Sequence, residues 1–230
     1  IVTYSHVGTG NYNEKTANIY TDISYLTSNR AIGHDLTSLF NMITGFSKPD
    51  ELKRIKYSPY TLRPTLVDEM TRCCTESTAD DPSHIYIKIN SLSDIEMVGT
   101  IEYLIEKYPT CQWHITVRGI CSLPALDRYT NVTIKSVVGR FLEHSRIYGF
   151  ISKGKDRVYI SSADMLTRNL DKRIEILCPI NDKSCKTRLF DILNTFERDS
   201  VNSWYATENG FIQREKTDVN CHNEFIKLTR

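Results

Sequence analysis

Hydrophobic side chains that recur every three or four residues predict an amphipathic helix over residues of about 30–44. Its apolar positions are Ile32, Leu36, Leu39, Phe40 and Ile43. Gly45 stands where helices commonly end in a glycine. The proline-containing stretch 47–50 then breaks the pattern, and we place a boundary between two units there, running to Arg54.

A strand–helix–strand pattern follows. Residues 84–90 alternate, with Ile85, Ile87 and Ile89 on one face and Tyr86 and Lys88 on the other. A capping box, Ser93-Asp94-Ile95-Glu96, starts a helix that continues to Pro109, and a second strand covers 113–117. Such a βαβ unit predicts an α/β fold with a largely parallel sheet.

Weaker patterns predict the remaining elements. Residues 1–4 alternate like a strand, and Pro64 occupies the first position of a helix that buries Val67, Met70 and Cys74. Further strands are expected at 132–136, 146–150, 158–161 and 174–177, and a late helix carries Leu189, Ile192, Leu193 and Phe196. From Val201 onward no periodicity is clear.

Composition narrows the class of protein. The 230 residues carry 29 Lys and Arg against 28 Asp and Glu, and 40% are hydrophobic, which is ordinary globular composition. A net charge of +1 argues against a broad basic face for nucleic acid, so phosphate recognition must come from a few placed arginines. No apolar run approaches the roughly 18 residues of a membrane span. Seven cysteines without a C-x-x-C pair indicate reduced, buried thiols in a cytoplasmic protein.

His144 and Arg146 are candidate chemical residues. Two positions apart on a strand, they would project to the same face. An imidazole can act as nucleophile, base or proton donor, while a guanidinium can bind phosphate with two hydrogen bonds, so the pair suits phosphoryl chemistry. A surface His beside a surface Arg is the competing interpretation of so short a motif.

Two further segments contain small and polar residues that fit a phosphate site. Ser162 lies just after the 158–161 strand, with Asn169 and Glu175 downstream, and Asn169 could donate to an oxyanion. A helix start followed by a charged turn is the alternative. The turn Gly8-Thr9-Gly10-Asn11-Tyr12-Asn13-Glu14-Lys15 also suggests a phosphate cradle, but it does not match the P-loop spacing, so a structural turn competes.

Long blocks of residues, spread over nearly the whole chain, resemble the sequence of a known protein family. The blocks are His6 to Ala17 with Tyr20-Thr21-Asp22; Val117 to Leu123; Arg140 to Arg146; and Tyr159 to Asp164 through Arg168-Asn169-Leu170-Asp171 to Arg173 and Glu175. On these residues the sequence resembles the C-terminal part of bacterial polyphosphate kinases.

The resemblance implies a phospholipase D-like α/β fold with a mixed, largely parallel sheet flanked by helices. Residues 1–54 would be the C-terminal remnant of a first catalytic unit, and residues 55–230 a complete second unit. In this family ATP and polyphosphate exchange a γ-phosphoryl through a phosphohistidine. That histidine is expected upstream, because His6 is followed two positions later by Gly8 and not by Lys or Arg. The absence of an initial Met fits this expectation of a fragment that is inactive alone.

The resemblance also assigns residues. Tyr20, Arg118 and His144 match the ATP-binding residues, with Tyr20 on the base or ribose. His144, Arg146, Asn169 and Glu175 would be catalytic, with Glu175 orienting an imidazole. Weaker phosphate-lining candidates are Asn11, Asn13, Lys15 and Ser162. The Mg²⁺ ligands of the family lie upstream, so no metal ligand is assigned in this chain.

The sequence departs from the family pattern at positions that bear on contacts with the polyphosphate chain. Met165 stands where the family usually has Trp, and the loop after Ser122 lacks a basic residue. The expected partners are ATP or ADP and inorganic polyphosphate, without nucleic acid, in a homo-oligomeric cytoplasmic enzyme that could associate peripherally with the inner membrane. Two alternatives stay open: a non-catalytic nucleotide- or polyanion-binding module, and a phospholipase D-like phosphodiesterase, which would favour Lys over Arg146.

Overall fold

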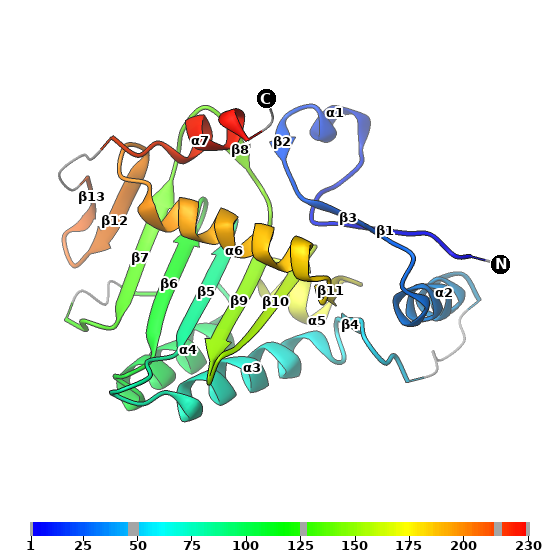
Figure 1. Ribbon diagram of the computed structural model, residues 1–230, viewed down its shortest axis with the longest axis horizontal. Coiled ribbons are helices and arrows are strands. Elements are labelled where there is room, and N and C mark those ends of the chain that lie inside the picture. Colours follow the sequence, from blue (N-terminus) through cyan, green and yellow to red (C-terminus); the bar gives the residue numbers. More distant parts are fainter. Residues whose placement is uncertain (1, 46–50, 125–127, 214–217, 229–230) are drawn as a thin grey trace.

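A nine-stranded mixed sheet forms the centre of the computed structural model, which describes residues 2–45, 51–124, 128–213 and 218–228 (Figure 1). The strands lie in the order β13 (Gly210–Ile212), β12 (Ser203–Thr207), β7 (Val132–Val137), β6 (Gln112–Val117), β5 (His84–Ile89), β9 (Ile147–Ser152), β10 (Lys155–Ser161), β11 (Ile176–Pro179) and β4 (Lys56–Tyr57). The predicted α/β class is confirmed.

The expectation of a largely parallel sheet is wrong. Parallel pairing is confined to β5 with β6 and β6 with β7, and the other neighbours in the sheet are antiparallel. The antiparallel pairing of β9 with β10 follows from a short connection. Lys153 and Gly154 both have positive φ, 47° and 63°, and make the tight turn of the β9–β10 hairpin. So short a loop can join only antiparallel strands.

Helices cover both faces of the sheet. On one face lie α3 (Leu62–Glu76) and α4 (Ile95–Lys107), and on the other lies α6 (Lys183–Arg198) (Figure 1). The alternation of β5 follows from this: its isoleucines pack in the cluster that contains α3 and α4, while Tyr86 packs with residues of α6. Because both faces are covered, even Lys88 is buried.

Helix starts differ slightly from the predictions. Asp94, and not Ser93, is the N-cap of α4: its side chain accepts a hydrogen bond from the backbone N–H of Met97. α3 begins at Leu62, so Pro64 is its third residue. α6 confirms the late helix, with Leu189, Leu193 and Phe196 buried.

The N-terminal residues form a smaller layer beside the sheet. It contains β1 (Ser5–Gly8), α1 (Glu14–Ala17), β2 (Tyr20–Thr21), β3 (Ser24–Thr27) and α2 (Arg30–Gly45). The first strand of the described residues therefore begins at Ser5, and residues 2–4 lie outside any strand, contrary to the prediction for residues 1–4. The helix predicted over 30–44 is confirmed as α2, although Phe40 and Ile43 are exposed. The predicted break at 47–50 lies outside the described residues.

β2 and α2 provide two of the contacts that attach this layer to the rest. β2 pairs in parallel with β8 (Leu142–Glu143), so Thr21 lies opposite Glu143. The buried carboxylate of Asp35, in α2, accepts hydrogen bonds from three successive backbone N–H groups at residues 53–55. The boundary that we place near Arg54 is thus bridged by a side chain, and the division into two units stays a prediction.

Several short elements carry no signal that we could detect in the sequence. They include α5 (Thr167–Asp171), α7 (Cys221–Lys227), β8, β12 and β13. The cysteines of the chain are free, five of them buried and two half-buried. Within the described ranges, no helix is both long enough and apolar enough to cross a membrane.

Asp94 provides a test of the fold. Burial alone would raise the pKa of its carboxyl, but hydrogen bonds from Arg63, Thr167 and the Met97 N–H outweigh burial and lower the pKa to about 2, below the ordinary 3.8. The folded state therefore binds this proton more weakly than the unfolded state. Asp94 stabilises the fold above about pH 4 by on the order of 2 kcal/mol, and this contribution is lost as the pH falls toward 2.

Asp94→Asn should lower the free energy of unfolding by about 2 kcal/mol at pH 7, because asparagine still caps α4 but cannot form the ion pair with Arg63. Urea unfolding at a series of pH values would show the gap to wild type narrowing between pH 4 and pH 2. Asp68→Asn, an exposed position on α3, is the control and should change little. If the difference in the free energy of unfolding between wild type and Asp94→Asn did not change with pH, the ionised carboxylate of Asp94 would not be its source.

Candidate active site

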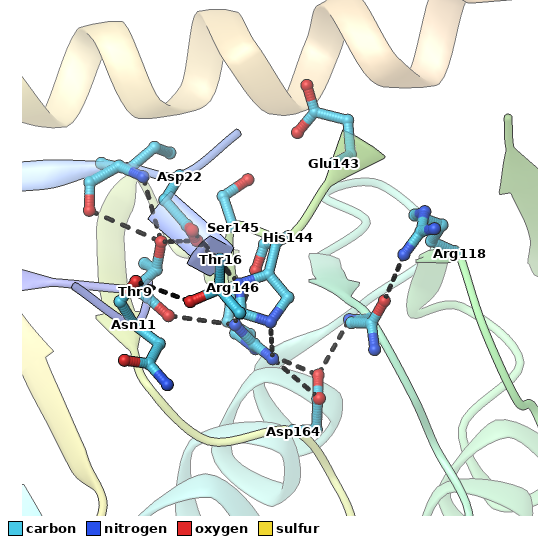
Figure 2. Close-up of polar contacts among 12 residues, drawn as sticks. Thr9, Asn11, Thr16, Asp22, Arg118, Glu143, His144, Ser145, Arg146 and Asp164 are labelled. Atoms are coloured by element: carbon cyan, nitrogen blue, oxygen red, sulfur yellow. Dashed lines mark hydrogen bonds and ion pairs between the residues drawn. The ribbon is translucent and has the colours of Figure 1, made fainter. Parts of the chain in front are cut away.

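His144 lies between β8 and β9, where residues of the N-terminal layer hold it (Figure 2). Its backbone N–H donates to the Thr21 carbonyl at 2.9 Å, and its Nδ1 lies 3.1 Å from Asp22 Oδ1. The imidazole also stacks on the Tyr20 ring, with centroids 4.3 Å apart. Tyr20 and His144, two of the predicted ATP-binding residues, are therefore in direct contact although 124 positions separate them in the sequence.

The contacts of the imidazole define its tautomer. Nδ1 lies near the Asp22 carboxylate, which only accepts, and 2.9 Å from Arg146 Nη1, whose two N–H groups already donate to the carbonyls of Thr9 and His144. We therefore place the proton on Nδ1, where it is donated to Asp22. Nε2 then accepts from Arg146 Nη2 at 2.9 Å. This is the arrangement in which a carboxylate orients a histidine and stabilises its charged form.

Arg146 lies beside His144, as predicted, but its guanidinium is buried and fully occupied. Nε and Nη2 donate to the two oxygens of Asp164, at 3.1 and 2.9 Å. Nη1 donates to the carbonyls of Thr9 and His144, at 3.0 and 2.8 Å. With the contact from Nη2 to His144, these bonds use all five N–H donors of the guanidinium. The predicted phosphate clamp at Arg146 is therefore not what the structure shows, because this side chain holds His144 in place.

Asp164 extends the network toward Arg118. Its Oδ1 also accepts from the backbone N–H groups of Asn90 and Ser91, at 2.9 and 3.1 Å. The Asn90 side-chain oxygen in turn accepts from Arg118 Nη1 at 3.1 Å (Figure 2). Asn90 was not among the residues to which we gave a role. Its position directly after the β5 strand was the available signal, since ligand sites of α/β sheets gather at strand ends.

Arg118 differs from Arg146 in how many of its N–H donors are already hydrogen-bonded. It is half-buried, and among the residues that the structure describes its side chain donates only to Asn90. Most of its five donors thus stay available for an anion. Of the two arginines that the sequence singled out, Arg118 is the one whose donors are not all engaged among the described residues.

Ser162, Asn169 and Glu175 form a cluster of their own. Glu175 accepts from the Ser162 hydroxyl and from the Asn169 amide, both at 2.5 Å. The carboxylate expected to orient an imidazole is thus engaged with these two side chains, and Asp22 is the carboxylate that contacts His144. Asp22 follows β2 in a segment without periodicity, so the sequence alone did not indicate this role.

The glycine turn serves the site indirectly. Asn13 caps α1 and Asn11 accepts from the Asn13 N–H, so both amides stabilise the turn, while Lys15 is exposed. These contacts fit the structural alternative better than a phosphate cradle. Gly10 has a different reason to be glycine: a Cβ there would lie 2.2 Å from Asp22 Oδ2. The turn leaves room for the carboxylate that orients His144.

The protonation of Asp22 follows from its neighbours. Burial would raise the pKa of this carboxyl, but the hydrogen bonds from His144 and from the Thr9 hydroxyl, together with the charge of Arg146, lower the pKa below its ordinary value. Asp22 is therefore ionised at neutral pH and can stabilise an imidazolium. Within the described part of the chain, no group of three or more His, Cys, Asp or Glu side chains could hold a metal ion.

Comparison with known proteins gives one consistent result. The family model described as polyphosphate kinase C-terminal domain 2 matches residues 55–224, and the model described as polyphosphate kinase C-terminal domain 1 matches residues 1–49. The polyphosphate kinase of Streptomyces coelicolor is 39% identical over 221 residues, which cover 94% of this chain and 29% of the relative. That of Pseudomonas aeruginosa is 36% identical over 213 residues, covering 92% and 31%.

A solved structure agrees. The crystal structure of polyphosphate kinase from Porphyromonas gingivalis matches with a TM-score of 0.91 and 29% identity, over 99% of this chain and 36% of that chain. The chain spans about a third of the length of these relatives. The similarity therefore concerns one region of a larger kind of protein.

The contact between Gly10 and Asp22 generates a prediction. Gly10→Ala should displace the Asp22 carboxylate from His144, because the new methyl group would lie 2.2 Å from Asp22 Oδ2, 2.4 Å from its Cγ and 2.9 Å from its Cβ. The ¹⁵N resonances of the His144 imidazole, which report its tautomer, should shift in this variant. Gly99→Ala is the matched control, since a Cβ at Gly99 meets nothing within 4 Å. Unchanged His144 resonances in Gly10→Ala would show that the turn does not constrain Asp22.

Proposed function

The chain belongs to the polyphosphate kinase family, and we propose that it carries the nucleotide side of a site that transfers the γ-phosphoryl of ATP to inorganic polyphosphate and back. The observation that carries this proposal is the joined network from Arg118 through Asn90, Asp164 and Arg146 to His144. It links a phosphate-binding cation to an oriented imidazole, as phosphoryl transfer requires.

Substrate binding is assigned to Arg118 and Tyr20. The Arg118 guanidinium donates hydrogen bonds to the phosphate oxygens of ATP and neutralises their negative charge. One face of the Tyr20 ring covers His144, and the other face packs on the base or ribose. Positioning and electrostatic stabilisation account for most of the catalysis in phosphoryl transfer, so two fixed contacts on the nucleotide would contribute directly to the rate.

The role of His144 follows from its tautomer. Asp22 holds Nδ1, and Nε2 would exchange its hydrogen bond from Arg146 Nη2 for a proton or a hydrogen bond shared with the transferred phosphoryl or with the departing one. Asp22 stabilises the imidazolium that donates from Nε2, and Arg146 fixes the ring. In the transfer itself, the bond between the γ-phosphorus and its bridging oxygen breaks as a bond to the acceptor nitrogen forms. Asn169 and Ser162, held by Glu175, line the pocket at a greater distance from the reacting atoms.

The phosphohistidine of the family matches no residue of this chain, so we propose that another part of the polypeptide supplies the acceptor nitrogen. We also propose, from the family resemblance, that the Mg²⁺ ligands lie outside this chain. Mg²⁺, when bound, neutralises phosphate charge. The homo-oligomeric state and the cytoplasmic location, with or without peripheral membrane association, stay predictions.

A chimaera tests the function directly. Residues 1–230 would replace the matching third of the Streptomyces coelicolor polyphosphate kinase, and the formation of ADP and of polyphosphate would be measured. Activity is expected in the chimaera and not in residues 1–230 alone. His144→Ala should lower turnover in the chimaera by about 10²–10⁴-fold, the usual loss for a general acid or base. ATP binding without turnover would instead support the non-catalytic module, and activity of residues 1–230 alone would overturn the placement of the acceptor.

Arg118→Gln should raise the KM for ATP in the chimaera by about tenfold or more, because it removes a charge-assisted contact to phosphate. Turnover at saturating ATP should change less. Arg72→Gln, in which a half-exposed arginine that pairs with Glu69 on α3 is neutralised, is the control and should leave KM unaltered. A normal KM in Arg118→Gln would remove Arg118 from the nucleotide site.

A further inference from the structure

Lys88 is a buried cation that the proposed chemistry does not use. It lies on β5, on the face toward α6, and its side chain is only 4% exposed. Its ammonium donates to Glu143 Oε2 at 3.2 Å and to the Ser145 carbonyl at 3.1 Å, and lies 4.9 Å from the centroid of the Phe196 ring. Glu143 and Ser145 are the two neighbours of His144, so one ammonium contacts both sides of this residue.

Stability alone does not account for a charged pair in this position. Glu143 is also buried, with 6% of its side chain exposed, and removing two charges from water costs about as much as their attraction returns. Apolar side chains of similar volume usually serve a core at least as well. An ammonium differs from an apolar group in that its directed donors can bind a carboxylate and a carbonyl together, which defines the path of the backbone between them.

We propose that Lys88 is a positioning residue for His144, acting through Glu143 and the Ser145 carbonyl. This inference rests on the proposed function, in which His144 contacts the phosphoryl group. The segment is also held by β2, through the pairing of Thr21 with Glu143, by Arg146, whose Nη1 donates to the His144 carbonyl at 2.8 Å, and by α7, where His222 Nδ1 accepts from the Phe141 N–H at 3.3 Å. Lys88 adds the contact at Ser145, on the far side of His144.

The consequence of losing the ammonium follows from these contacts. The Glu143 carboxylate and the Ser145 carbonyl would both stay buried without their donor, and the backbone at 143–145 would have to move to reach other partners. A displacement of about 1 Å at a reacting group lowers turnover by as much as about 10²-fold. We expect kcat to fall and the KM for ATP to change little, because Arg118 and Tyr20 still bind the nucleotide.

Lys88→Met is the first test, made in the chimaera with Lys135→Met as the matched control. Lys135 is another buried lysine of the same sheet, with 1% of its side chain exposed, and its ammonium donates to the carbonyls of Glu197 and Asp199. We expect kcat to fall at least about tenfold in Lys88→Met with the KM for ATP within about threefold, and kcat to stay within about twofold in Lys135→Met. Equal losses in both variants, or none in Lys88→Met, would overturn the proposal.

A double variant separates position from stability. Lys88→Met with Glu143→Gln removes both charges, so no unpaired carboxylate stays buried, and the denaturation midpoint should return toward that of the wild type. The kcat should nevertheless stay low, since the bond to the Ser145 carbonyl is still absent. Recovery of kcat together with stability would reduce Lys88 to a stabilising residue. This variant also covers the case in which Lys88→Met alone does not fold.

The ¹⁵N resonances of the His144 imidazole, measured in residues 1–230, test the placement without any activity. They should shift in Lys88→Met and stay unchanged in Lys135→Met. If they shift while the chimaera proves inactive, the proposed function fails and the positioning stands. If the chimaera is active and the resonances do not move, the positioning fails and the function stands.

Discussion

The burial of the Arg146 guanidinium is the constraint on which the arrangement of the site depends. A cation with five N–H donors can leave water only if each donor finds an acceptor, because an unpaired buried charge is strongly destabilising. Its acceptors come from three separate stretches of the chain: Asp164 after β10, the carbonyl of Thr9 in the glycine turn, and His144 itself. Satisfying Arg146 therefore brings the N-terminal layer, the His144 segment and the end of the central sheet together.

In the arrangement that results, the two arginines of the site have different roles. Arg146 is saturated and fixes the imidazole, whereas Arg118, tied only by Asn90 among the described residues, keeps donors for a phosphate. Asp22 completes the division, since its ionised carboxylate holds Nδ1 while Arg146 contacts Nε2. A protein with a net charge of +1 can thus prepare a phosphate site by placing a few charges, without a basic surface.

How much of the fold the sequence predicted depended on the length and regularity of each element. β5, α4, β6 and α2 show clear periodicity and were predicted within a few residues, and α6 was expected from its apolar residues without bounds. β2 and β8, two residues each, have no periodicity to detect, and they exist because they pair with each other across 122 positions. The proportion of parallel strands was wrong for a related reason: the βαβ unit is visible in the sequence, while the antiparallel partners of β5 and β11 are set by tertiary pairing.

The sequence by itself determined the α/β class, the family resemblance and the candidates Tyr20, Arg118 and His144, because these depend on residue types and spacing. Only the tertiary structure decided what each side chain does. Arg146 turned from a phosphate clamp into a support for His144, Asp22 took the place at the imidazole expected for Glu175, and Lys88 proved to be buried beside His144. The physical reason is that hydrogen-bond partners 137 and 122 positions apart, as in Arg146 with Thr9 and His144 with Asp22, leave no local pattern in the chain.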